Sequence, residues 1–194
     1  MKAVTLPLYI CIAFLLTSCV EKPKDVVMHT STGYALGTTY SIKYEVQNEK
    51  EDYKNDIENV FHEVNQSMSA YIPTSDISRI NRGEKDVIID AYFRTVYDFS
   101  REVYEKTEGY FDPSVGALVN AWGFGPEKPI NNLTKKQVDS IMEFTGFDKV
   151  KISKEGKVYK DHPSLTFDFN SLGKGYAIDL IGKMFDEKGI KNYI

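Results

Sequence analysis

The chain has 194 residues, of which 42% are hydrophobic and 27% charged, with a formal net charge of −4 at pH 7. This length supports one domain or slightly more, and the hydrophobic fraction is sufficient for a buried core. The acidic balance and the lack of a Lys/Arg cluster argue against a nucleic-acid partner. The three histidines do not have the spacing of zinc ligands, and no Gly-x-Ser-x-Gly motif supports a serine nucleophile.

The N-terminal residues have the pattern of an export signal. Residues 6–16 form an apolar run that is too short to span a bilayer comfortably. The run leads into Leu16-Thr17-Ser18-Cys19, which resembles a bacterial lipoprotein box, so residues 1–18 are predicted to be a lipoprotein signal peptide and Cys19 the lipidated first residue. An ordinary secretory signal with an incidental cysteine is the alternative. Lipidation predicts an exported chain held on a bacterial membrane, facing the periplasm or cell exterior, with residues 19–32 as a tether.

The first half of the mature chain predicts strands and amphipathic helices. Residues 34–46 are predicted to be mostly strand, because apolar and polar side chains alternate over 40–46 after a turn-prone Gly37. Residues 87–89 suit a short buried strand. Apolar residues at helical spacing predict helices over 52–68 and 91–108. Between them, residues 69–81 break at Pro73 and restart as a short helix with Ser75 placed to cap it.

The next segment predicts two further helices and a hairpin. Asp112 before Pro113 is a typical helix start, and this helix is expected to end near Trp122. Thr134 and Gln137 form a capping-box pattern that opens a helix over 134–144. Residues 149–152 and 158–160 are expected to pair as a hairpin.

Residues 165–179 carry the strongest functional signal. Apolar residues alternate with polar ones over 165–169, which predicts a short strand. We expect a break at Asn170, a turn at Gly173-Lys174-Gly175, and then an amphipathic helix ended by Gly189. A glycine-flanked turn at a helix N-terminus lets backbone N–H groups approach an anion, and Lys174 adds positive charge. The pattern favours a nucleotide diphosphate site; the alternative is a strand–turn–helix whose glycines serve only conformation and packing.

The order of these elements lacks regular βα alternation, which predicts an α+β fold with a mixed, largely antiparallel sheet and packed helices. Residues 191–194 resemble the start of another strand, so we expect the domain at 33–194 to be incomplete at its C-terminus.

Four separated segments, in this order, resemble the ApbE-type flavin transferases, which are FAD:protein FMN transferases. They are ALGTTYSIKY (35–44), SAYIPTSDISRIN (69–81), GYFDPSVGALVNAWGFG (109–125) and FDFNSLGKGYAID (167–179). The resemblance implies magnesium-dependent transfer of FMN from FAD to a threonine hydroxyl of an acceptor protein, with release of AMP. It also implies that the acceptor is a flavoprotein subunit of a respiratory redox complex.

The resemblance also implies roles for particular residues. Positions that contact FAD in the family are expected at Leu36, Tyr71, Tyr110, Phe111, Asp112, Asp168 and Lys174. Ser171 falls at a magnesium-ligand position and is expected to act through its backbone carbonyl; no residue is assigned as catalytic. Tyr71 and Phe111 could instead be core aromatic residues, Asp112 could be only a helix cap, and Lys174 could be a solvated lysine.

Two alternatives to FMN transfer stay open. One is hydrolysis of FAD to FMN and AMP, and the other is a lipid-anchored flavin-binding protein without chemistry. The family's further magnesium ligands lie in a later segment that residues 1–194 do not contain. We therefore expect the isolated 194-residue chain to be poorly stable and inactive.

Overall fold

A computed structural model describes residues 26–194 of the chain. The predicted signal peptide, Cys19 and the first part of the predicted tether lie outside the described residues. The elements, in chain order, are β1 (Val27–Ala35), β2 (Thr38–Val46), α2 (Lys54–Met68), α3 (Asp76–Asn81), α4 (Ala91–Lys106), α5 (Gly116–Ala121), α6 (Lys135–Met142), η1 (Phe147–Lys149), β3 (Val150–Ile152), β4 (Val158–Lys160) and α7 (Asn170–Glu187). This is the predicted α+β class, with two antiparallel sheets of two strands each in the described part. Within residues 26–194, no helix is both long and apolar enough to cross a bilayer.

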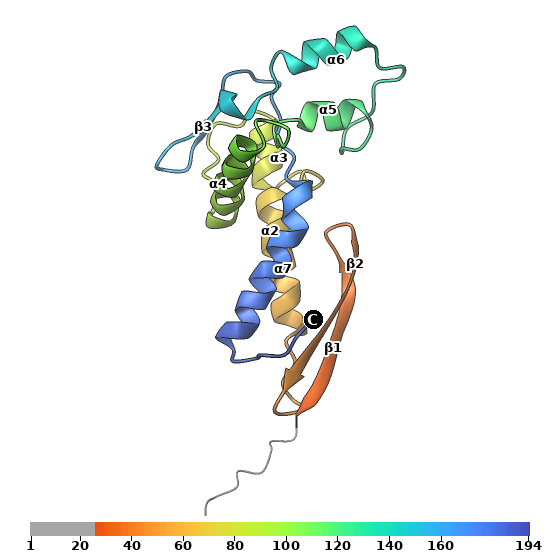
Figure 1. Cartoon of the computed structure of the whole chain (residues 1–194), viewed down its shortest axis with the longest axis vertical. Helices are drawn as coiled ribbons and strands as arrows, with labels where there is room; N and C mark the ends of the chain where they lie inside the picture. The colour runs from red at the N-terminus through yellow and green to blue at the C-terminus, as the bar shows by residue number, and fades with distance from the viewer. Residues whose placement is uncertain (1–25) are drawn as a thin grey trace, which may run out of the picture.

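The long β1–β2 hairpin lies beside the paired helices α2 and α7 (Figure 1). Its strands pair from Val27 opposite Val46 to Ala35 opposite Thr38. Leu36 and Gly37 form the two-residue turn, with φ of 50° and 77°, as such hairpin turns require. Residues 27–32, expected in the tether, therefore belong to a strand. After Val27 and Met28 their side chains are polar and do not alternate with apolar ones, so only their pairing with β2 defines them as a strand.

An aromatic core lies where the hairpin meets the helices. The Tyr44 ring is fully buried, 5.0 Å from the Phe185 ring of α7 between centroids. Its hydroxyl donates to Asp52 Oδ1 at 3.0 Å and accepts from the Tyr53 backbone N–H at 3.1 Å, just before α2 begins. Farther along, Phe93 of α4 makes edge-to-face contacts with Phe167 and Phe169. These contacts fix the segment before α7 against the helices.

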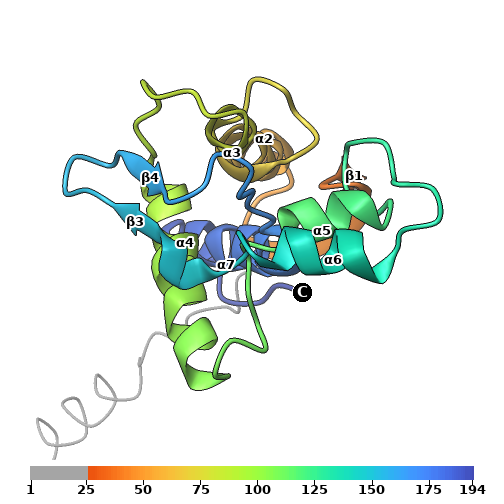
Figure 2. The same cartoon turned by 90° about the horizontal axis from the view of Figure 1, so that it is seen from above.

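Local signals for helix ends are confirmed at several positions. Ser75 caps α3 by accepting from the Ser78 N–H, and Thr134 and Gln137 form the expected capping box of α6. Gly109, with φ of 82°, follows the end of α4. The hairpin of β3 and β4 is also confirmed, and it lies on the opposite flank of the molecule from α5 and α6 (Figure 2).

The helix expected to start at Asp112 begins later. Asp112 Oδ1 accepts from the Ser114 N–H at 2.8 Å and from the Ser114 hydroxyl at 2.6 Å. These bonds close a local turn, and α5 begins only at Gly116, without a side-chain cap. An aspartate before proline can cap a turn as well as a helix. Residues 87–89 likewise make only an isolated bridge, between Ile88 and Lys157.

The strand and glycine turn expected before the last helix are also wrong. Residues 165–169 do alternate in burial, but their one β-bridge joins Thr166 to Val115. The helix α7 begins at Asn170, so Gly173, Lys174 and Gly175 are helical residues and neither glycine has a positive φ. A Cβ placed on Gly173 would lie 3.9 Å from Met68 Sδ of α2. A Cβ would make only an ordinary contact at Gly173 and would stand in open space at Gly175, so neither a turn nor close packing requires these glycines.

The last described residues pair with β2. The Lys43 N–H donates to Ile194 O at 2.7 Å, and the Ile194 N–H donates to Lys43 O at 2.9 Å. The expected start of a strand at 191–194 is thus seen as an antiparallel bridge between Tyr44 and Tyr193.

Replacing Ser75 by alanine is expected to lower the free energy of unfolding by about 1–2 kcal/mol. The Ser75 side chain is fully buried; its hydroxyl accepts from the Ser78 N–H at 3.2 Å and donates to Ser69 O at 2.7 Å. Urea denaturation followed by circular dichroism measures the change. Ser164→Ala, at an exposed position, is the control, and equal stabilities of the two variants would contradict the prediction.

Tyr92 is expected to make stability depend on pH in the alkaline range. Its hydroxyl donates to a Glu63 carboxylate oxygen, and this bond, with burial, raises the pKa of Tyr92 to about 12. The folded chain therefore keeps this proton at a pH where the unfolded chain loses it, above about pH 10. The free energy of unfolding should fall between about pH 10 and 12, and Tyr92→Phe should flatten that fall. Urea titrations at several pH values test this, with the exposed Tyr159→Phe as control; equal slopes in wild type and Tyr92→Phe would refute it.

Candidate functional site

Two hollows adjoin the N-terminus of α7, and Asn170 lines both of them. The first, of about 680 Å³, lies between the hairpin turn, the end of α2 and the first turns of α7. The second, of about 480 Å³, lies between the segment at 109–115 and the residues around Asn170. Segments that are distant in sequence therefore meet at one helix end.

The residues singled out from the sequence divide between the two hollows. Leu36, Tyr71 and Lys174 line the first. The others line the second: Tyr110, Phe111, Asp112, Asp168 and Ser171. The structure thus gathers all eight around the start of α7, while their binding of FAD or magnesium stays a prediction.

The aromatic residues of the site expose their rings. Tyr110 is 96% exposed and Tyr71 is 56% exposed, so Tyr71 is not the core residue that the alternative allowed. The Tyr71 hydroxyl donates to Phe124 O at 2.8 Å, which joins the turn before α3 to the glycine-rich exit of α5. Phe111 is partly buried, and its N–H donates to Thr107 Oγ1. Exposed aromatic faces of this kind can stack on flat ligand rings.

Asp168 lies directly before the first turn of α7. Its Oδ1 accepts from the Asn170 N–H at 2.7 Å, and its Oδ2 accepts from Asn170 Nδ2 at 3.2 Å. The carboxylate is favourable at the positive end of the helix dipole, and it orders Asn170, the residue that lines both hollows. Lys174 is exposed one turn farther along. This helix end therefore offers oxygen ligands together with a nearby cation.

The oxygen donors around the second hollow fit a magnesium ion in type. Asp112 and Asp168 supply carboxylates and Ser171 a further oxygen, and Mg²⁺ prefers oxygen ligands. Residues 26–194 contain no group of three or more acidic, histidine or cysteine side chains close enough to hold a metal. A pair of carboxylates that shares the ion with substrate phosphates is a usual magnesium arrangement. The described residues would supply one part of such a site.

Two backbone hydrogen bonds join the segment that follows Asp112 to the extended segment that contains Asp168. The Asp168 N–H donates to Pro113 O at 2.8 Å, and the Gly116 N–H donates to Thr166 O at 3.0 Å. Ser114, fully buried, donates to Asp112 and accepts from the Gly146 N–H at 2.8 Å. The backbone of residues 113–116 thus positions Asp168, and the buried Ser114 positions Asp112.

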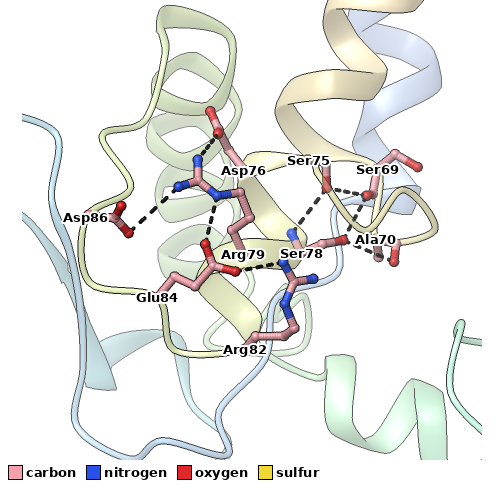
Figure 3. Close-up of polar contacts among 9 residues, drawn as sticks. All are labelled: Ser69, Ala70, Ser75, Asp76, Ser78, Arg79, Arg82, Glu84 and Asp86. Atoms are coloured by element: carbon pink, nitrogen blue, oxygen red, sulfur yellow. Dashed lines mark hydrogen bonds and ion pairs between the residues drawn. The ribbon is translucent and has the colours of Figure 1, made fainter.

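An ion-pair cluster fixes the helix α3 that follows Tyr71 (Figure 3). Arg79 reaches three carboxylates, at 2.8 Å for Glu84, 3.6 Å for Asp76 and 3.7 Å for Asp86. Burial raises the pKa of the Asp76 carboxyl, with a smaller contribution from the Asp90 charge. Figure 3 also shows the hydroxyls of Ser75 and Ser78 turned to the Ser69 carbonyl oxygen, which closes the turn before α3.

Three residues that hold the site together were not predicted from the sequence: Asn81, Ser114 and Lys160. Asn81 and Ser114 stand inside the quoted segments, but nothing in their local pattern distinguishes them from capping or turn residues. Lys160 lies in a strand outside those segments. Its Nζ donates to Leu165 O at 2.8 Å and to Asn81 O at 3.2 Å, and burial lowers its pKa.

The chain is similar in sequence and in fold to known proteins of one family. Residues 36–194 match the model of the ApbE family. The chain is 36% identical over 187 residues to the FAD:protein FMN transferase of Vibrio cholerae, covering 93% of this chain and 54% of the relative. It is 29% identical over 196 residues to that of Haemophilus influenzae, covering 95% of this chain and 56% of the relative.

Solved structures show the same fold. The structure of the flavin transferase ApbE from Vibrio cholerae matches with a TM-score of 0.79 and 32% identity, over 87% of this chain and 56% of that one. The apo form of a Pseudomonas stutzeri flavinyl transferase matches with a TM-score of 0.78 at 24% identity, over 87% of this chain and 55% of that one, which concerns the fold alone. The chain spans about half the length of the curated relatives that it matches.

Proposed function

Since the chain belongs to the ApbE family, we propose that it forms part of an enzyme that transfers FMN from FAD to an acceptor protein. In more detail, a threonine hydroxyl of the acceptor attacks the phosphorus of the FMN half of FAD. The diphosphate P–O bond breaks, AMP leaves with the bridging oxygen, and the threonine proton is lost to solvent or to a base. The acceptor is a flavoprotein subunit of a respiratory redox complex.

The observation that carries this proposal is the meeting of the four family segments at the N-terminus of α7. Exposed rings line both hollows, Tyr71 the first and Tyr110 the second, and Asp112 and Asp168 also line the second. Phosphoryl transfer of this kind needs positioning and charge stabilisation more than covalent chemistry from the protein. Rings suited to flavin or adenine beside oxygen ligands suited to magnesium meet both needs.

Magnesium, when bound, would neutralise the diphosphate and polarise its phosphorus. In this chain Asp112, Asp168 and Ser171 would be the protein ligands of the magnesium ion. Ser171, the second residue of α7, would supply an oxygen from its backbone carbonyl. Lys174 would supply a further positive charge toward the leaving AMP.

We further propose that Cys19 carries a lipid and holds the enzyme on a bacterial membrane, facing the periplasm or cell exterior. The sequence Leu16-Thr17-Ser18-Cys19 supports this. Metabolic labelling with a palmitate analogue tests it: label should enter the wild type and be absent from Cys19→Ser. Equal labelling of both would refute the anchor.

The activity is tested by the intact mass of an acceptor peptide that carries a threonine flavinylation motif. The peptide is incubated with FAD, Mg²⁺ and the natural full-length protein without its signal peptide. A gain of one FMN that disappears with EDTA supports the transferase. Release of FMN and AMP without peptide labelling supports FAD hydrolysis instead. Bound FAD without either reaction supports a flavin-binding protein.

A further inference from the structure

Asn81, the last residue of α3, makes a two-point contact with a distant extended segment. Its Nδ2 donates to Phe167 O at 3.0 Å, and its Oδ1 accepts from the Phe167 N–H at 2.8 Å. One carboxamide therefore satisfies both backbone groups of a buried residue 86 positions away. Among side chains, only an amide offers a donor and an acceptor side by side in this way.

The contact completes a partial sheet. In an extended chain, successive residues direct their backbone groups to opposite sides. Thr166 and Asp168 bond to the segment at 113–116, whereas Phe167 faces the other way, toward Asn81. The Asn81 side chain thus takes the place of a second neighbouring strand. Lys160 adds a tie between the same two segments, since its Nζ donates to the carbonyls of Asn81 and Leu165.

We infer that Asn81 is a positioning residue that fixes the direction of Asp168 and the N-terminus of α7. Asp168 follows Phe167 directly, and α7 begins two residues later. Asn81 also ends the segment at 69–81, which contains Tyr71, so it links a residue of the first hollow to the carboxylates of the second. Only the expected effect of Asn81 on FAD binding and FMN transfer rests on the proposed function.

The test compares Asn81→Ala with Thr134→Ala in the natural full-length protein. Thr134 caps α6, is exposed and lines neither hollow, so its loss reduces stability without touching the site. We expect Asn81→Ala to raise the Kd for FAD about 10-fold and to lower kcat at saturating FAD and Mg²⁺ about 10-fold or more, as for other supports of a ligand-binding group. Thr134→Ala should leave both values unchanged.

Amide hydrogen exchange supplies a readout that needs no ligand or activity. In Asn81→Ala, the amides of Phe167, Asp168 and Asn170 should exchange at least about 10-fold faster relative to those of α2. This would be a local opening rather than a global one. Asn81→Asp keeps the acceptor for the Phe167 N–H but sets its second oxygen against Phe167 O, so its effects should have the same direction as those of alanine. If Asn81→Ala is too unstable to purify, Asn81→Asp decides the question by the same measurements.

The inference is overturned if exchange at these three amides changes only in parallel with α2. It is equally overturned if the Asn81 variants keep wild-type Kd and kcat while they melt at a lower temperature, as Thr134→Ala does. Failure of the proposed function has a different signature, because wild type itself then labels no peptide. The exchange data still decide the positioning role in that case.

Discussion

Replacing Asp168 by asparagine is expected to lower the rate of FMN transfer roughly 100-fold. The carboxylate accepts from both the N–H and Nδ2 of Asn170, and so it orders the residue that lines both hollows. An amide can keep one of these bonds but would present its own NH₂ group to Asn170 Nδ2. It also removes a negative charge that a magnesium ion would use. Both losses act where the diphosphate is proposed to bind.

Transfer by Asp168→Asn is measured from the mass of the acceptor peptide across a magnesium titration. We expect a lower rate at every concentration and a shift of the half-maximal point to higher Mg²⁺. Asp98→Asn, on the exposed face of α4, is the matched control for loss of one acidic charge. Wild-type rates in Asp168→Asn would remove Asp168 from the proposed site, whatever the control shows.

The parts of the fold predicted well from sequence are those decided by neighbouring residues. The Ser75 cap, the Thr134–Gln137 capping box and Gly109 after α4 each depend on atoms within a few residues. The amphipathic faces of α2 and α4 follow in the same way from helical spacing. Such signals are sufficient to place most helices and the β3–β4 hairpin.

The errors arose where distant contacts decide between two local possibilities. Asp112 can start either a helix or a turn, and its bonds to Ser114 select the turn. Residues 165–169 show the burial of a strand, but they are held by two backbone hydrogen bonds to 113–116 and by the Asn81 side chain instead of by a regular strand ladder. Residues 27–32 look like a polar linker until β2 pairs with them. Local pattern could not reveal any of these partners.

The candidate site was assembled from family resemblance rather than from residue chemistry. The structure brings the eight named residues around one helix end, which spacing alone could not have predicted. The supports of the site were not found, because a carboxamide such as Asn81 looks like any helix-terminal polar residue. Its function depends on Phe167, and the sequence carries no signal for a contact across 86 positions.

Gly116→Ala is expected to lower the free energy of unfolding by about 3 kcal/mol, the upper end of the usual cost of overpacking. A Cβ at this position would lie 2.8 Å from Thr166 O and 2.9 Å from Phe167 O. Backbone oxygens cannot swing aside as a flexible side chain can, so the two segments must separate. Separation also weakens the bond from the Gly116 N–H to Thr166 O, and with it the junction that aligns Asp112 with Asp168.

Gly175→Ala provides the matched control, because it makes the same chemical change in another helix. A Cβ on Gly175 would have no heavy atom within 4 Å, apart from its chain neighbours and its own helix backbone. Alanine there should raise the free energy of unfolding by about 0.5–1 kcal/mol, since it reduces the conformational entropy of the unfolded chain. Urea denaturation of both variants should therefore give shifts of opposite sign. Shifts of the same sign would mean that Gly116 is not held tightly against 166–167, and the alignment of the two carboxylates would then need another cause.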